Sequence, residues 1–239
     1  MGVGQRRAAS VAVFVACLVV AASPLVSPRS AGELSLERMA DHVAAIAAGP
    51  HPMGSAANER VRDYLVEVLA EFDVTVQMQT VEVDDYFSQP SGMVEITNVF
   101  ARLSGEQSER PVVFVAHYDS VPTTAGANDN AAAVAALLEV ARFLSASSPP
   151  VDVILLFTDG EEPAPRYGAT AAVTHPWLDD PRLVVNLEGI GGSGPSMLVE
   201  VSGPTSDLVS VLSGAVPHPV AYSFLTKTTD LIGGGLDRL

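Results

Sequence analysis

The spacing of hydrophobic and polar positions changes along the chain, and each spacing predicts a different kind of element. In residues 55–73, SAANERVRDYLVEVLAEFD, apolar side chains recur every three or four positions behind a serine, which predicts a capped helix with one apolar face. Residues 74–83 and 92–105 alternate apolar and polar positions and are rich in β-branched side chains. These two segments are predicted to be paired strands at one edge of a sheet.

Three later segments are instead continuous apolar runs, with helix-compatible stretches between them. They are PVVFVA at 111–116, VDVILLFTD at 151–159 and RLVVNLEG at 182–189. Continuous runs suit strands that are covered on both faces, which is typical of a parallel sheet between helices. We therefore predict an α/β fold with three layers, αβα, around a mixed and mostly parallel central sheet.

The first 31 residues have a different pattern from the rest of the chain. An arginine pair precedes an uncharged run over 8–28, the layout of an export signal or of a single membrane anchor. Val20 and Ala22 suit cleavage after Ala22, yet the run is also about long enough to span a bilayer. We expect residues 32–239 to form one domain outside the cytoplasm, either secreted or held at the membrane by this segment.

Composition narrows the classes of function. The chain has 239 residues, 48% of them hydrophobic, which is enough for a sizeable core. Its formal net charge of -15 argues against affinity for nucleic acid phosphates and for anionic lipid headgroups. We expect no nucleic acid partner, and contact with a membrane only through the N-terminal segment.

Charged side chains end each of the three apolar runs. In open α/β sheets ligands collect at the carboxyl edge of the strands, so these side chains should converge there. Imidazole and carboxylate groups without a thiolate suit zinc or a similar divalent ion, with hydrolytic chemistry. The residues are His117 and Asp119 at the end of the first run, Asp159, Glu161 and Glu162 at the end of the second, Glu188 at the end of the third, and Asp129 before the intervening helix.

Each of these residues also has a purely structural explanation. His117 could be a hydrogen-bonded histidine, and DGEE at 159–162 could be an ordinary acidic turn. Asp129 could cap a helix, since ANDN precedes an alanine-rich stretch. The conjunction favours a metal site, because like charges collected on one edge repel and a cation compensates them.

Four motifs in order carry a family resemblance. HYDS at 117–120, GANDNAAAVAALLEVAR at 126–142, FTDGEE at 157–162 and NLEGIG at 186–191 resemble the zinc exopeptidases related to bacterial leucine aminopeptidase, peptidase family M28. Within that family the chain is most similar to the endoplasmic-reticulum metallopeptidase type, whose catalytic domain opens on a segment like GPHPMGSAANERVRDYL at 49–65. The likeness covers about residues 35 to 230.

The resemblance implies a phosphorylase/hydrolase-like fold, two zinc ions per chain and hydrolysis of peptide bonds. Family members mostly remove single N-terminal residues from peptides, although some are carboxypeptidases or cyclise glutamine. The implied zinc ligands are His117 and Glu188 for one ion, Glu162 for the other and Asp129 for both, with Asp119 orienting His117 and Glu161 as general base.

One departure from the family pattern concerns the second zinc. Relatives complete that site with a late histidine, whereas His175 and His218 both come too early in this chain. The resemblance therefore implies a second site that lacks one ligand, a sheet without its last strand and helix, and weak or absent turnover.

Two alternatives to an aminopeptidase stay open. One is a non-catalytic ectodomain that uses the same fold for binding. The other is a di-zinc amidohydrolase or carboxypeptidase, although that group usually carries an inserted lid for which the stretch between Glu162 and Glu188 leaves no room. The oligomeric state and the preferred substrate side chain do not follow from the residues.

Overall fold

The computed structural model describes residues 33–85, 92–162, 166–189, 197–199, 205–215 and 220–221. The predicted N-terminal signal or anchor and His218 lie outside these ranges. None of the described helices combines the length and apolar character that crossing a membrane requires. The helices are α2 (Leu36–Ile46), α3 (Ala56–Ala70), α4 (Ala131–Ser145), α5 (Tyr167–Ala172), the 3-10 helix η1 (Pro176–Leu178) and α6 (Thr205–Ala215). The strands are β1 (Thr75–Asp85), β2 (Gly92–Leu103), β3 (Gln107–His117), β4 (Val151–Thr158), β5 (Leu183–Asn186), β6 (Met197–Leu198) and β7 (Val220–Ala221).

Five strands form one mixed sheet in the order β1-β2-β4-β3-β5. The β1–β2 and β2–β4 pairs are antiparallel, whereas β3 is parallel to both β4 and β5. Among these five strands, only β2 therefore runs against the others. The prediction of a paired β1 and β2 at one edge, followed by parallel core strands, is confirmed.

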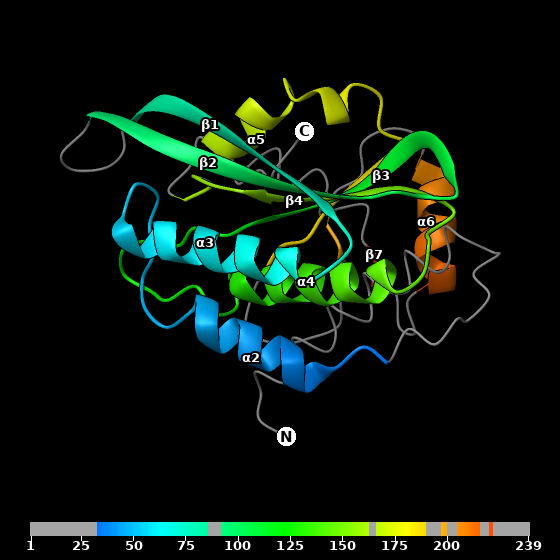
Figure 1. Ribbon diagram of the computed structural model, residues 1–239, viewed down its shortest axis with the longest axis horizontal. Coiled ribbons are helices and arrows are strands. Elements are labelled where there is room, and N and C mark those ends of the chain that lie inside the picture. Colours follow the sequence, from blue (N-terminus) through cyan, green and yellow to red (C-terminus); the bar gives the residue numbers. More distant parts are fainter. Residues whose placement is uncertain are drawn as a thin grey trace.

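Helices cover both faces of this sheet, which confirms the three-layer αβα prediction. In Figure 1, α3 and α4 lie against one face with α2 beyond them, and α5 lies on the other face. The continuous apolar run of β4 serves both layers: Val153, Leu155 and Phe157 belong to the core under α3 and α4. Ile154 and Leu156 belong to the opposite core, under α5 and η1. A strand with two apolar faces requires this double cover.

Helix α4 is buried on nearly all sides because small residues let other elements approach it. Ala135 and Ala136 contact Met39 of α2, so α4 is sandwiched between the sheet and a second helix. Helix α2 was not predicted from the sequence, although Ser35 caps it by accepting the N–H of Arg38, and Met39 and Ile46 form its buried face. A serine before apolar positions at helical spacing is the signal that was available.

Glu139 is the one acidic residue buried within α4, and its hydrogen bonds link α4 to α2 and to the residue that precedes α2. Its carboxylate accepts hydrogen bonds from Arg38 Nη2 at 2.6 Å, Arg142 Nε at 2.9 Å and the backbone N–H of Ser35 at 2.7 Å. Burial raises the pKa of Glu139, but the hydrogen bonds from Arg142, Arg38 and Ser35 outweigh it and hold the pKa at about 2. The carboxylate is thus ionised and fully neutralised by the protein itself. We call these four residues the Glu139 cluster.

Candidate metal centre

The parallel register brings three strand ends to one edge of the sheet. His117 is paired with Thr158, the last residue of β4, and Val115 is paired with Asn186, the last residue of β5. The segments that follow β3, β4 and β5 therefore leave the sheet side by side. This places His117, the turn at 159–162 and Glu188 together, as the order of the apolar runs led us to expect.

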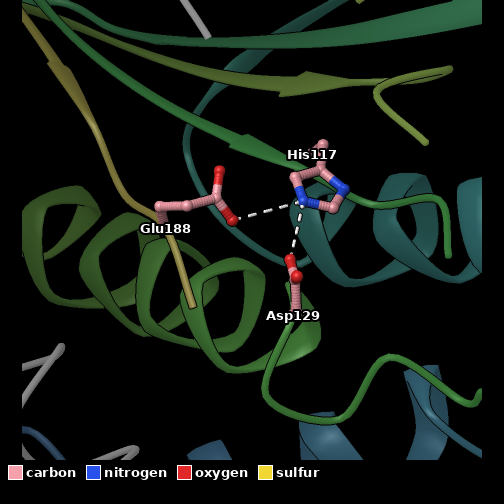
Figure 2. Close-up of side chains that lie close together, drawn as sticks. All are labelled: His117, Asp129 and Glu188. Atoms are coloured by element: carbon pink, nitrogen blue, oxygen red, sulfur yellow. Dashed lines mark hydrogen bonds and ion pairs between the residues drawn. The ribbon is translucent and has the colours of Figure 1, made fainter. Parts of the chain in front are cut away.

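Three ligand-type side chains meet at this edge, and we call them the His117 cluster: His117, Asp129 and Glu188. His117 Nε2 lies 3.0 Å from Asp129 Oδ1 and 3.4 Å from Glu188 Oε1. One ligand atom from each residue lies within 4.8 Å of the other two. Figure 2 shows both carboxylates directed at the same imidazole nitrogen, from the start of α4 and from the segment after β5.

The electrostatics of the cluster favour a positive charge at its centre. Burial lowers the pKa of His117, but hydrogen bonds with Asp119, Asp129 and Glu188 outweigh it and raise the pKa well above its ordinary value. Burial raises the pKa of Asp129, but the hydrogen bond with His117 and the charge of His117 outweigh burial, so the pKa is lowered overall. The acids around the imidazole outnumber it, so their charge is left partly uncompensated.

This donor set fits zinc. One imidazole nitrogen and two carboxylate oxygens converge on a common point, and zinc is bound by these atom types in three-ligand catalytic sites. The described part of the chain supplies no thiolate here, which suits an ion in hydrolytic rather than redox chemistry.

Asp119 touches both His117 and the turn that carries the glutamate pair. The Nδ1 atom of His117 lies 3.2 Å from the Asp119 carbonyl oxygen and 3.5 Å from carboxylate oxygen Oδ1. The two carboxylate oxygens accept the backbone N–H groups of Glu161, at 3.1 Å, and of Glu162, at 2.9 Å. Fully buried Asp119 therefore links the strand that ends in His117 to the turn after β4.

Glu161 and Glu162 follow Gly160, whose φ of +69° makes the tight turn after β4. Burial raises the pKa of Glu162, and so does the negative charge of Asp129, which places Glu162 within electrostatic reach of the His117 cluster. Glu162 is not among the side chains that meet within 4.8 Å. Glu161 Oε1 lies 3.5 Å from the Nε atom of Arg166. The structure thus gathers three of the four predicted ligands.

Asp129 does not cap the helix that it precedes. The N-cap position of α4 is Asn130, and its side chain makes no capping hydrogen bond. The Asp129 carboxylate instead reaches His117. The Asp129 side chain therefore contacts the imidazole, and Asn130 takes the N-cap position of α4.

Asp159 is a buried residue whose contacts the sequence did not reveal. Its carboxylate accepts hydrogen bonds from the backbone N–H of Thr97 and from Asn58 Nδ2, both at 3.0 Å. Burial and the negative charge of Asp119 raise the pKa of Asp159 to about 7. A cavity of about 220 Å³ between α3 and β2 opens onto Asp159, but its lining includes no residue of the His117 cluster. Asp159 therefore supports the turn rather than the cluster.

The segment before α3 contacts the residues next to the site. His51 donates its backbone N–H to Ser120 Oγ at 2.9 Å and accepts the Ser120 N–H at 3.3 Å. Met53 packs against the turn, because a Cβ at Gly160 would lie 3.2 Å from its sulfur. The motif GPHPMGS is the signal that pointed to this segment, although not to these contacts.

An open sheet between two helical layers, with a histidine and carboxylates at its carboxyl edge, is typical of αβα metallohydrolase domains. Comparison with known families makes the class specific. Residues 98–233 match the model of Peptidase family M28, which covers more than half of the chain. The chain belongs to this family, and the resemblance carried by the four motifs is confirmed.

Curated relatives are fungal membrane proteases that are much longer than this chain. A vacuolar membrane protease of Candida albicans (strain SC5314 / ATCC MYA-2876) is 34% identical over 186 residues, covering 76% of this chain and 21% of the relative. One from Schizosaccharomyces pombe (strain 972 / ATCC 24843) is 29% identical over 185 residues, covering 73% and 22%. The chain spans about a fifth of the length of these relatives.

Solved structures share the fold at low sequence identity. A Porphyromonas gingivalis glutaminyl cyclase has a TM-score of 0.63 at 19% identity, and the match covers 84% of this chain and 80% of the cyclase chain. A leucine aminopeptidase precursor from Bacteroides thetaiotaomicron has a TM-score of 0.58 at 19% identity, covering 67% and 63%. A Zn-dependent exopeptidase from Parabacteroides distasonis has a TM-score of 0.56 at 22% identity, covering 68% and 64%. These likenesses establish the αβα fold.

Proposed function

We propose that this domain is a zinc-dependent exopeptidase of the aminopeptidase type, which hydrolyses peptide bonds at a co-catalytic di-zinc site. The observation that carries the proposal is the convergence of Asp129 and Glu188 on the Nε2 atom of His117. Membership of Peptidase family M28 supports the reaction class. The Zn-dependent exopeptidase among the structural neighbours supports zinc as the ion.

His117, Asp129 and Glu188 would hold the first zinc. Asp129 would also face the second zinc, together with Glu162. Because the described residues offer the second ion only these two carboxylates, we expect it to bind more weakly than the first. Asp119 would hold the His117 ring, and hydrogen bonding of this kind commonly fixes the orientation of a metal-binding imidazole.

Glu161 would be the general base. When bound, zinc supplies Lewis acidity that polarises the scissile carbonyl and lowers the pKa of water. The Glu161 carboxylate would take a proton from that water and deliver it to the departing amine. Asp119 serves this step because it accepts the Glu161 N–H and so fixes the backbone from which the base extends.

The substrate would be a peptide, and the domain would work outside the cytoplasm. The curated relatives are named as vacuolar membrane proteases, which supports association with a membrane through the N-terminal segment. The net charge of -15 supports the absence of nucleic acid partners. N-terminal sequencing of the exported protein would distinguish cleavage of that segment from its retention.

The test measures zinc content and hydrolysis of a leucine aminoacyl reporter on the full chain, alongside Glu161→Gln. We expect bound zinc in the wild type but weak turnover, because the described residues offer the second ion only two carboxylates. In Glu161→Gln we expect the same zinc content and a kcat lower by about 10²- to 10⁴-fold, the usual contribution of a general base. Unchanged kcat in this variant would remove Glu161 from the reaction.

The same assay separates the alternatives. Stoichiometric zinc without hydrolysis of any peptide would indicate a non-catalytic binding domain. Hydrolysis of N-acyl amino acids, but not of free N-termini, would indicate an amidohydrolase. A chain that binds no zinc would refute the proposed function altogether.

A further inference from the structure

The loop that carries Asp129 is joined to the segment that carries Glu188 by hydrogen bonds on both sides of the two ligands. Asn128 Nδ2 donates to the carbonyl oxygen of Gly189 at 2.9 Å. Asn130 Nδ2 donates to the carbonyl oxygen of Leu187 at 2.8 Å. The residues before and after Asp129 thus bind the residues after and before Glu188, and the two carboxylates lie between these bonds.

This contact is close as well as hydrogen-bonded. A Cβ at Gly189 would overlap the carbonyl oxygen of Asn128 and would lie 2.7 Å from its carbonyl carbon. Asn130 is 1% exposed and Leu187 is 4% exposed, so the second bond is shielded from water. Leu187 also donates its N–H to Val115 of β3 at 2.9 Å, which ties the segment to the central sheet.

Helix capping does not explain Asn130. Asparagine at an N-cap normally accepts the N–H of the second or third helical residue through its side-chain oxygen. Here no such bond is made. The Oδ1 atom of Asn130 is buried and lacks a hydrogen-bond partner among the described residues, while its Nδ2 atom is committed to Leu187. The Asn130 side chain therefore binds the segment after β5 and does not cap α4.

We propose that Asn128 and Asn130 are positioning residues that hold Glu188 opposite Asp129, so that both carboxylates and His117 can bind one zinc ion. The inference rests on the proposed zinc site and names residues of this chain that prepare it. Figure 2 shows the result of this arrangement, with Glu188 and Asp129 approaching the imidazole from two different segments. Without the two amides, the position of Glu188 would depend on the short strand β5 and on the hydrogen bond from Leu187 to Val115.

The decisive variant is Asn130→Asp in the full chain. Aspartate has nearly the same shape and is an equally good N-cap, but in its ionised form it has no proton to donate to Leu187. Its extra negative charge would, if anything, attract a cation. A capping role and simple electrostatics therefore both predict equal or tighter zinc binding, whereas a positioning role predicts weaker binding.

Two more variants test the contact from its other sides. Asn128→Ala removes the second donor, and Gly189→Ala introduces a methyl group where the two segments touch. Asp152→Asn is the matched control. It disturbs a buried carboxylate that pairs with Arg102 and accepts the Gly105 N–H, at the opposite end of β4 from the site.

The measurements are zinc affinity, by competition with a chromophoric chelator, and the thermal stability of the metal-free chain. We expect Asn130→Asp and Asn128→Ala to weaken zinc binding by about 10- to 100-fold, the range typical when residues that orient metal ligands are changed. Their loss of thermal stability should not exceed that of Asp152→Asn, which should keep wild-type zinc affinity.

Wild-type zinc affinity in both asparagine variants would overturn the inference while leaving the proposed function intact. A wild-type chain that binds no zinc would overturn the proposed function and the inference with it. If Asn130→Asp does not fold, Asn128→Ala and Gly189→Ala decide: weaker zinc binding in both supports the positioning role, and unchanged binding in both refutes it.

Discussion

Two charged clusters of this domain, each built around one buried side chain, balance their charges in opposite ways. Beneath α2, the Glu139 carboxylate meets two guanidinium groups and a backbone N–H, so the protein supplies every counter-charge itself. At the edge of the sheet, the single imidazole of His117 faces Asp119, Asp129 and Glu188. A cluster that neutralises itself is structural, whereas one with surplus acid is suited to an added cation.

The largest effect should come from Glu139→Ala. Removing the carboxylate leaves Arg38 and Arg142 without their shared acceptor. Breaking a buried ion pair from one side typically costs about 3–5 kcal/mol, and because Arg38 is 45% exposed to water we expect the lower end, about 3 kcal/mol. We expect the free energy of unfolding to fall by that amount while zinc affinity stays at the wild-type value. Urea unfolding and chelator competition measure the two quantities.

Glu67→Ala is the control for this change, because Glu67 is an exposed acid on α3 and its loss should alter stability by less than about 0.5 kcal/mol. A parallel loss of zinc affinity in Glu139→Ala would show that the two clusters are not independent.

The free energy of unfolding should also depend on pH through the Glu139 cluster. The pKa of Glu139 is held at about 2, below its ordinary 4.5, so the ionised form stabilises the folded state. That contribution is complete above about pH 4.5 and is lost as the pH falls through the folded pKa near 2. At about 1.4 kcal/mol per pKa unit it amounts to roughly 3 kcal/mol.

Glu139→Gln should therefore flatten the dependence of unfolding free energy on pH between about 5 and 2, as followed by urea midpoints. A slope equal to that of the wild type would mean that other carboxylates dominate acid unfolding.

A somewhat smaller effect distinguishes the His117 cluster. Zinc at 100 times its dissociation constant should raise the free energy of unfolding by about 2.7 kcal/mol, because the ion binds the folded chain. His117→Ala should abolish this gain, and Glu139→Gln should keep it. Unfolding curves with zinc and with a chelator give the increment, and a full increment in His117→Ala would show that zinc binds elsewhere.

Local patterns predicted most of the elements. The periodicity of residues 55–73 predicted α3, and the apolar run at 151–159 predicted a strand covered on two faces. They did not reveal α2, because its mixture of alanine, charged and apolar residues was not recognised as a helical face. Its position depends on contacts between distant residues, since Arg38 binds Glu139, 101 residues later, and Met39 packs on Ala135 and Ala136.

Part of the candidate site also followed from the chain order. Because β3, β4 and β5 are parallel neighbours, their ends had to meet, which gathers His117 and Glu188. Asp129 joined them although the residues alone allowed it to be a cap. The charge of Asp129 acts on Glu162, but the Glu162 side chain is not part of the same group, and its position depends on the turn after β4.

By itself, the sequence determined the types of the elements, the edge of the sheet at which the acids collect and the family, because each depends on neighbouring residues or on ordered motifs. Only the tertiary structure decided that Asn128 and Asn130 bind the backbone around Glu188, and that Asp119 accepts the N–H groups of Glu161 and Glu162. Such bonds join segments tens of residues apart. Their existence depends on strand order and register, which no short window of residues contains.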